Sequence, residues 1–278
     1  MLVYDTSMVK FIKIDETDKV VQALEANLFS YFTNFGRTPL GELHESSHLL
    51  YFSTGIGSLF HNGVFRARLH ESEVERAIAE VIEYFAAKQV PFCWWTSNST
   101  QPNDLGKYLE AQGLQDLGNF PGMAMDLSNL TSRDCPKDLE IVRVEERTNL
   151  ESWLKIAAIA FNIPVELVEE LLPLESSLGF QGDRYIRYLA LWQKTPVAIS
   201  ALYLDAGVAG IYFVATLPEA RGQGIGTHVT QAALEDSQKL GYRVAILQAS
   251  AMGKNVYERL SFQECCPLEI YLWQPPEQ

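Results

Sequence analysis

The chain has few cysteines, few basic residues and no long apolar run. Its four cysteines show no Cys-x-x-Cys spacing, which indicates a reducing compartment and no disulfide framework. No run approaches the about 18 uninterrupted apolar residues of a membrane-spanning helix, and the N-terminus shows no signal-peptide pattern. We therefore expect a cytoplasmic protein that uses no membrane.

The shortage of positive charge disfavours nucleic acid as a partner. The chain has 22 Lys and Arg against 35 Asp and Glu, a formal net charge of −13, which opposes binding to nucleic acid. An acidic surface instead favours a cationic amine. The length of 278 residues and a hydrophobic content of 47% are enough for two packed domains of average size.

The most informative segment is Arg221-Gly222-Gln223-Gly224-Ile225-Gly226, between an apolar strand at 209–215 and a helical run at 227–240. Glycines let the backbone turn tightly and approach a ligand, and a helix N-terminus leaves N–H groups free. Together they predict a socket for a pyrophosphate. The spacing is not that of the Rossmann fingerprint, and the Gly-Lys-Ser/Thr of a P-loop is absent.

This segment resembles the acetyl-CoA loop of the GCN5-related N-acetyltransferase (GNAT) superfamily, because Arg-x-x-Gly-x-Gly follows a strand that ends in Val-Ala-Thr-x-Pro-Glu. The run Val256-Tyr257-Glu258-Arg259-Leu260-Ser261-Phe262 resembles the Leu-Tyr-Glu-Lys-Leu-Gly-Phe segment of the same enzymes. The order of expected elements, β-α-α-β-β-β-α-β-α-β, extends the resemblance over about residues 138–273.

The resemblance implies acetyl-CoA as co-substrate and no metal. It places Tyr257 as the general acid that protonates the departing thiolate, and Ser250 where many members carry Asn. The backbone around Val214 would hold the pantetheine arm, and the glycine loop would hold the pyrophosphate. The implied cofactor-binding residues are Phe213, Val214, Thr216, Arg221, Gly222, Gln223, Gly224, Ile225, Gly226, Thr227 and Ser250.

The first half is interpreted as a degenerate copy of the second. A helix at 71–88, strand at 90–97, helix at 105–110 and strand at 122–127 mirror the second half from Thr227 onward, and the strand at 63–69 parallels the one at Gly210. Gly63 and Val90 are 27 positions apart, whereas Gly210 and Val244 are 34 apart, and the glycine loop is missing. Such a copy cannot bind CoA in the usual way, and we expect it to complete the substrate cleft or to stabilise the second half.

The predicted fold is therefore α/β, with two tandem GNAT-like domains that each have a mixed central sheet flanked by helices. The domains span residues 1–130 and 138–278, joined by a polar linker. Within the second domain, Pro164 is predicted to open a helix at 165–172 that Pro173 ends, and Thr148 and Glu151 to form a capping box.

No general base can be identified from the sequence. The carboxylates that lie in segments walling the substrate side of GNAT enzymes are interpreted as solvated surface charges: Glu166, Glu169, Glu175 and Asp183. An ordered water, or a group from the first domain, remains an equal alternative.

A second motif competes with the first. His44-Glu45-Ser46-Ser47-His48 matches the His-Glu-x-x-His of zinc proteases, which requires both histidines on one helical face. Pro39 and Gly41 precede it, and it runs into an apolar segment that favours a strand. We interpret it as a loop and the start of a strand, and a zinc hydrolase as the least favoured function.

The leading hypothesis is an N-acetyltransferase that transfers an acetyl group from acetyl-CoA to a primary amine on a small molecule or peptide. The first alternative is a non-catalytic protein that binds or senses acyl-CoA. A tandem transferase using aminoacyl-tRNA or long acyl groups is a further alternative, which the acidic balance disfavours. The acceptor and the oligomeric state stay open.

Overall fold

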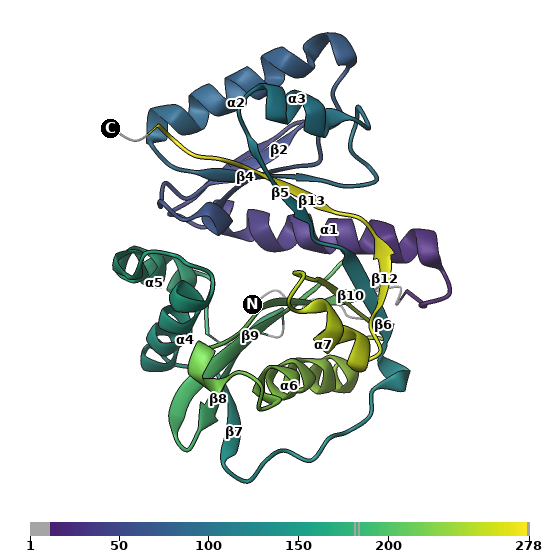
Figure 1. Ribbon diagram of the computed structural model, residues 1–278, viewed down its shortest axis with the longest axis vertical. Coiled ribbons are helices and arrows are strands. Elements are labelled where there is room, and N and C mark those ends of the chain that lie inside the picture. The colour runs from purple at the N-terminus through teal and green to yellow at the C-terminus, as the bar shows by residue number, and fades with distance from the viewer. Residues whose placement is uncertain (1–11, 181, 183, 277–278) are drawn as a thin grey trace.

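The computed structural model describes residues 12–180, 182 and 184–276. Two mixed sheets lie one above the other, and helix α1 (Thr17–Gly36) crosses the molecule between them (Figure 1). Among the described residues, no helix combines the length and the apolar character needed to cross a membrane. The mixed sheets flanked by helices confirm the predicted fold class.

The first sheet has six strands in the order β1-β2-β3-β4-β13-β5. Its strands are β1 (Glu42–Glu45), β2 (Leu50–Ser53), β3 (Asn62–Phe65), β4 (Phe92–Thr96), β13 (Glu269–Trp273) and β5 (Gln115–Asn119). Helices α2 (Val74–Lys88) and α3 (Leu105–Ala111) pack on one face, and α1 packs on the other. The short 3-10 turn η2 (Leu59–His61) precedes β3.

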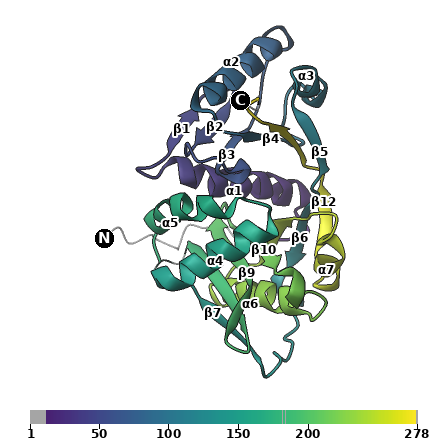
Figure 2. The same ribbon diagram turned by 60° about the vertical axis from the view of Figure 1, so that its left-hand side comes forward.

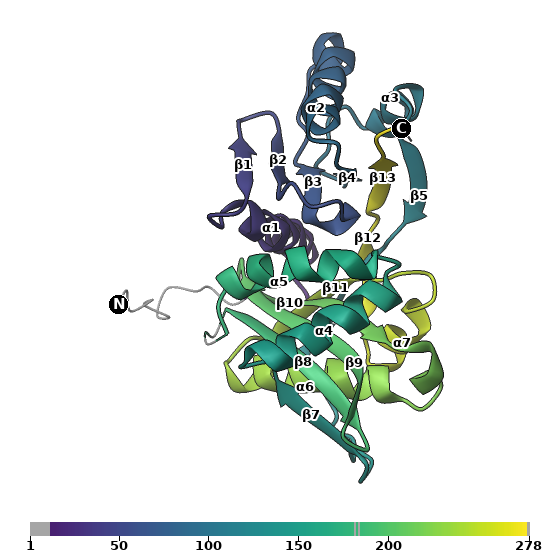
Figure 3. The ribbon, with the colours of Figure 1, turned by 90° about the vertical axis from the view of Figure 1, so that its left-hand side faces the viewer.

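The second sheet has seven strands in the order β12-β6-β11-β10-β9-β8-β7. Its strands are β12 (Gln263–Cys266), β6 (Gly122–Asp126), β11 (Val244–Gln248), β10 (Val208–Thr216), β9 (Thr195–Asp205), β8 (Tyr185–Trp192) and β7 (Leu139–Arg143). Helices α4 (Arg147–Ala160) and α5 (Val168–Ser177) cover one face, and α6 (Ile225–Lys239) and α7 (Lys254–Arg259) cover the other (Figure 3).

The two halves of the chain exchange a strand. Strand β6 of the first half pairs antiparallel with β11 over five residues, and β13 of the second half pairs antiparallel with β4 over five residues. Figures 1 and 2 show the C-terminal strand beside β4 in the upper sheet. This exchange has no signature in the sequence, because both strands are apolar and fit either sheet. The predicted linker thus separates two halves of the chain but not two independent sheets.

Three local expectations were wrong. Helix α5 continues through Pro173 to Ser177. Leu171, Leu172 and Leu174 are buried on both sides of the proline, and this packing outweighs one lost backbone hydrogen bond. The capping box does not form, because α4 begins at Arg147 and the Thr148 hydroxyl donates to Glu146. Helix α2 begins at Val74, after a 3-10 turn over 71–73.

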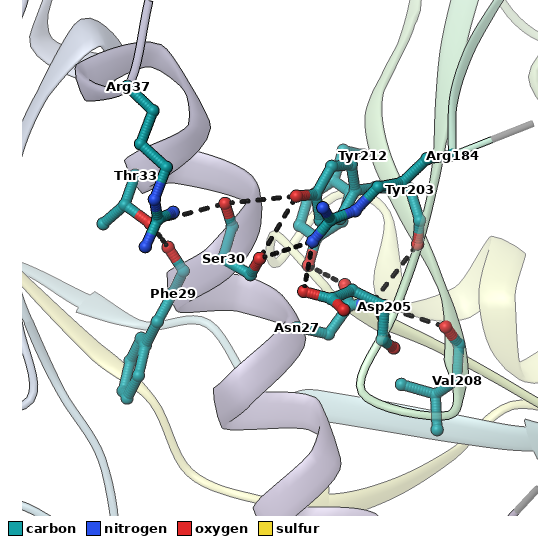
Figure 4. Close-up of polar contacts among 10 residues, drawn as sticks. All are labelled: Asn27, Phe29, Ser30, Thr33, Arg37, Arg184, Tyr203, Asp205, Val208 and Tyr212. Atoms are coloured by element: carbon teal, nitrogen blue, oxygen red, sulfur yellow. Dashed lines mark hydrogen bonds and ion pairs between the residues drawn. The ribbon is translucent and has the colours of Figure 1, made fainter. Parts of the chain in front are cut away.

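Helix α1 is fixed to the second sheet by a buried amide (Figure 4). Asn27 Nδ2 donates to the carbonyls of Tyr203, Asp205 and Val208 at 3.2, 3.0 and 3.4 Å, and its Oδ1 accepts from the Tyr212 hydroxyl at 2.7 Å. A Cβ on Gly210 would lie 2.2 Å from this Oδ1, so only glycine permits the approach. The amide therefore joins the first half of the chain to the β9–β10 hairpin.

Candidate functional site

Strands β10 and β11 separate after a short parallel ladder. Their paired residues are Ala209 with Ala245 and Gly210 with Ile246. Beyond this point β10 is bulged, since its register with β9 shifts between Tyr212 and Ala215. Phe213 within the bulge has a φ of 48°, which is uncommon for a residue other than glycine. A gap opens between the two strands.

The glycine loop lies at the mouth of this gap and begins α6. Gly222 and Gly224 have φ values of 78° and 76°, and nothing lies within 4 Å of a Cβ added to either residue. Gly224 is the N-cap of α6 and has no side chain to cap it, and the first turn holds no acidic residue. The first N–H groups of α6 therefore remain available to an anion, and the helix dipole favours one.

The gap is a cavity of about 730 Å³. Of the predicted cofactor-binding residues, ten line it: Phe213, Val214, Thr216, Arg221, Gly222, Gly224, Ile225, Gly226, Thr227 and Ser250. Gln223 is exposed on the loop and is not among the lining residues. The geometry thus brings together nearly all of the residues that the resemblance implied, and their cofactor contacts stay a prediction.

Tyr257 forms part of the wall opposite β10. It is the fourth residue of α7 and is 8% exposed. Burial raises the pKa of its phenol above the ordinary value, so the hydroxyl keeps its proton at neutral pH. Among the described residues the hydroxyl has no hydrogen-bond partner. It is a proton donor whose role, like those of the cofactor-binding residues, stays a prediction.

The sequence analysis missed a polar group on β11. Gln248 lines the cavity, and its buried Nε2 has no hydrogen-bond partner among the described residues. A buried donor left unpaired is costly, and its position in the wall leaves this N–H group available to a ligand acceptor. A glutamine in an apolar strand carries no sequence signal that distinguishes it from a surface residue.

Of the four carboxylates weighed as general bases, the three that the structure describes do not line the cavity. Glu166 and Glu169 are exposed, as predicted. Glu175 is not a surface charge: it is fully buried and forms an ion pair of 2.7 Å with buried Arg187, because α5 extends past the expected end. Asp183 lies outside the described residues.

The His-Glu-x-x-His segment forms the end of β1 and a turn, so its histidines do not share a helical face. His44 stacks on Tyr51, and its Nε2 lies 3.2 Å from the Tyr84 hydroxyl, whereas His48 is exposed. Within the described ranges, no group of three or more His, Cys, Asp or Glu side chains is placed to hold a metal.

The first half of the chain supplies walls that sequence reasoning did not assign. Phe32 of α1, Phe60 of η2, Trp95 of β4 and Phe120 before β6 line the cavity. Their periodicity is that of core residues, so no local pattern could have placed them at a site in the other half. The interface between the halves, and not the second half alone, encloses the cavity.

Comparison with known proteins identifies the class. Residues 150–262 match the acetyltransferase (GNAT) family. A GCN5-related N-acetyltransferase from Kribbella flavida has a TM-score of 0.68 at 18% identity, covering 96% of this chain and 97% of that one. One from Sphaerobacter thermophilus has a TM-score of 0.62 at 13% identity, covering 94% and 93%. No curated protein matches the chain significantly.

The duplicated architecture also has a precedent. A tandem GNAT protein from the clavulanic acid biosynthesis pathway has a TM-score of 0.54 at 12% identity, covering 100% of this chain and 98% of that one. At these identities the solved structures show the fold. Residues 150–262 thus match the GNAT family, which supports acetyl transfer as the general type of activity, and the whole chain has the fold of tandem GNAT proteins.

Proposed function

We propose that the protein is an N-acetyltransferase that transfers the acetyl group of acetyl-CoA to a primary amine and has one CoA site, in the second half. The observation that carries the proposal is the open gap between β10 and β11, which ends at the uncapped first turn of α6. Gly222 and Gly224 have free space on the side where a Cβ would point, and this fits a pyrophosphate. Residues 138–278 would hold the cofactor, and residues 1–130 would close the cleft.

The reaction is a direct acyl transfer. The amine nitrogen attacks the thioester carbonyl carbon, a C–N bond forms, and the C–S bond breaks. The thiolate takes a proton from the Tyr257 hydroxyl, which solvent then reprotonates, and the amine loses its proton to solvent. Backbone groups of the β10 bulge and the orphaned amide of Gln248 position the pantetheine arm and the thioester, so most of the rate enhancement comes from orientation and carbonyl polarisation.

One observation favours a non-catalytic acyl-CoA sensor as second candidate. Among the described residues, neither a carboxylate nor a histidine lines the cavity. An alkyl ammonium group, with a pKa of about 10, needs to lose a proton before it attacks, and no side chain in the wall accepts it. A sensor needs no such base.

Calorimetry with acetyl-CoA tests the site. We expect one molecule bound per chain and at least about 100-fold weaker binding for the double variant Arg221→Glu, Gly224→Asp, since both changes place negative charge at the anion site. The matched control is Arg76→Glu on the outer helix α2, which keeps the charge change away from the cavity. Equal affinity of the parent and the double variant contradicts the proposal. Thiol release with an amine panel then separates an enzyme from a sensor.

A further inference from the structure

Six phenylalanine and tryptophan side chains line the cavity, and they come from both halves of the chain. Phe60, Phe161 and Phe213 form one group, with ring centroids 5.3 to 5.9 Å apart. Trp95 lies 5.7 Å from Phe32 and 6.5 Å from Phe120 and forms a second group. All six line the cavity, and we call them the aromatic chamber. Phe213 belongs to the β10 bulge, so the chamber adjoins the place where the thioester is proposed to lie.

The chamber has no ionised side chain. Among the described residues, the charged side chains that line the cavity are Arg221, on the glycine loop, and Arg259, on α7. The buried carboxylates nearby have other partners, since Glu175 pairs with Arg187 and Glu25 accepts from the Ser99 N–H. Nothing in the wall therefore neutralises a cation or removes a proton from one.

These walls discriminate between amines. Burying an unpaired ammonium group in an apolar site is strongly unfavourable. A cation–π contact with the rings offsets part of that cost, but it stabilises the protonated form, which has no lone pair with which to attack. An amino group attached directly to an aromatic ring is uncharged at neutral pH, so it enters without that cost and needs no base before it attacks. Its ring can pack against the aromatic side chains that line the cavity.

We propose that the acceptor is an uncharged aromatic amine, with its amino group on the ring and its ring held in the aromatic chamber. This inference rests on the proposed function and names its acceptor class. It reverses the preference for a cationic amine that the net charge favoured, because the local chamber, and not the distant surface, contacts the acceptor. The amino nitrogen on the ring attacks the thioester carbon, so that the C–N bond forms and the C–S bond breaks. The nitrogen then loses its extra proton to solvent, and Tyr257 protonates the thiolate.

Binding to the protein saturated with free CoA tests the chamber without any reaction. We titrate 4-ethylaniline and 4-ethylbenzylamine, which differ in whether the amine is neutral or charged at pH 7. The aniline is expected to bind at least about tenfold tighter. Phe60→Ala and Phe120→Ala, each at a half-buried chamber position, are expected to weaken aniline binding at least about fivefold. Trp192→Ala, at a half-buried aromatic near the end of β8, is the control and is expected to leave it unchanged.

The outcomes separate this inference from the proposed function. Tighter binding of the benzylamine, no binding of the aniline, or equal loss in the Trp192→Ala control overturns the aromatic-amine acceptor even if acetyl-CoA binds. Competition between acetyl-CoA and long-chain acyl-CoA gives a further check. If the protein prefers long acyl chains and Phe60→Ala abolishes this preference, the chamber holds the acyl group and not the acceptor. Failure of acetyl-CoA binding itself contradicts the proposed function instead.

Discussion

The two halves each contain a parallel strand pair that separates, but only the second half leaves the gap open. The β3–β4 ladder has two pairs, Gly63 with Cys93 and Val64 with Trp94, and the β10–β11 ladder also has two. Each first strand then reaches a residue with positive φ, Arg66 at 49° and Phe213 at 48°. The first half thus retains the geometry from which the second half builds its cavity.

The first half fills its gap with its own chain. The Gln101 N–H donates to the Ala67 carbonyl at 2.9 Å, and the Leu69 N–H donates to the Gln101 carbonyl at 2.9 Å. Peptide groups of the loop after β4 thus occupy the position that corresponds to the proposed place of the pantetheine arm in the second half. The sequence of the first half also lacks the glycine loop, so the described residues 62–101 have neither the open gap nor the loop of the second half.

The two halves differ in what pairs with the backbone groups that strand separation frees. Strand separation alone makes no site, since the backbone groups that it frees must find partners. In the first half they pair with the chain, and the adjacent aromatic side chains Phe32 and Trp95 face the cavity of the other half. The same half of the chain therefore closes its own gap and contributes part of the wall of the cavity.

Separating the halves is expected to have the largest effect. Residues 138–278 alone lose β6, which covers β11 and buries Met123 and Met125. Each buried methionine contributes about 1.5–3 kcal/mol, a large part of the about 5–15 kcal/mol that stabilises a domain. We expect no cooperative thermal transition for either half expressed alone, and recovery when residues 1–137 and 138–278 are co-expressed. A normal melting curve for an isolated half would show that the exchange is dispensable.

Tyr257→Phe sharpens the comparison of the two short helices. Tyr257 is the fourth residue of α7 and Tyr108 is the fourth residue of α3, its counterpart in the first half. Loss of the proton donor is expected to lower kcat about 100-fold with the Kd of acetyl-CoA within about twofold. Tyr108→Phe, the matched control, is expected to leave both unchanged. Steady-state thiol release and calorimetry measure the two quantities, and equal turnover of Tyr257→Phe and the parent removes this residue from the mechanism.

Asn27→Ala tests the hydrogen bonds by which the Asn27 amide connects the two halves of the chain. The substitution leaves buried carbonyls of the β9–β10 hairpin and the Tyr212 hydroxyl without their amide partner. We expect a loss of about 2–3 kcal/mol in the free energy of unfolding, measured by urea titration. Asn34→Ala, a half-buried position on the same helix, is the control and is expected to cost less than about 1 kcal/mol. Similar losses of stability in both variants would show that the hydrogen bonds of Asn27 have no special role.

Buried His61 is expected to make the stability of the protein depend on pH, with a smaller effect than that of Asn27. Burial lowers the pKa of His61 to about 3 from 6.5, so the folded protein keeps the ring neutral while the unfolded chain gains a proton below pH 6.5. Stability is therefore lost as the pH falls from 6.5 towards 3. When the pH falls from 7 to 5, the free energy of unfolding of the parent should decrease by about 1–2 kcal/mol more than that of His61→Phe. Urea titration at the two pH values measures this difference. Parallel pH profiles would contradict a buried neutral ring.

Several features of this protein could be predicted from its residues. The glycine loop, the strand before it and the helix after it follow from local pattern, because positive φ, apolar runs and helix starts depend on nearby residues. The same holds for the repeat of helix and strand in the first half and for the absence of a helix at His44 to His48, although the end of β1 at this point was not predicted. Together with the resemblance to GNAT enzymes, these features predicted the fold class and the part of the cavity that the glycine loop and β10 line.

Other features depended on the tertiary structure. Strands β6 and β13 have the same apolar character, so only packing of the whole chain decides which sheet each one joins. Burial of neighbouring leucines carries α5 past Pro173, and the pairing of Glu175 with Arg187 takes a candidate base out of solvent. The aromatic chamber joins residues more than a hundred positions apart, and contact between such distant residues has no local signature. Sequence determined the elements and the loop, while long-range packing decided which of them enclose the site.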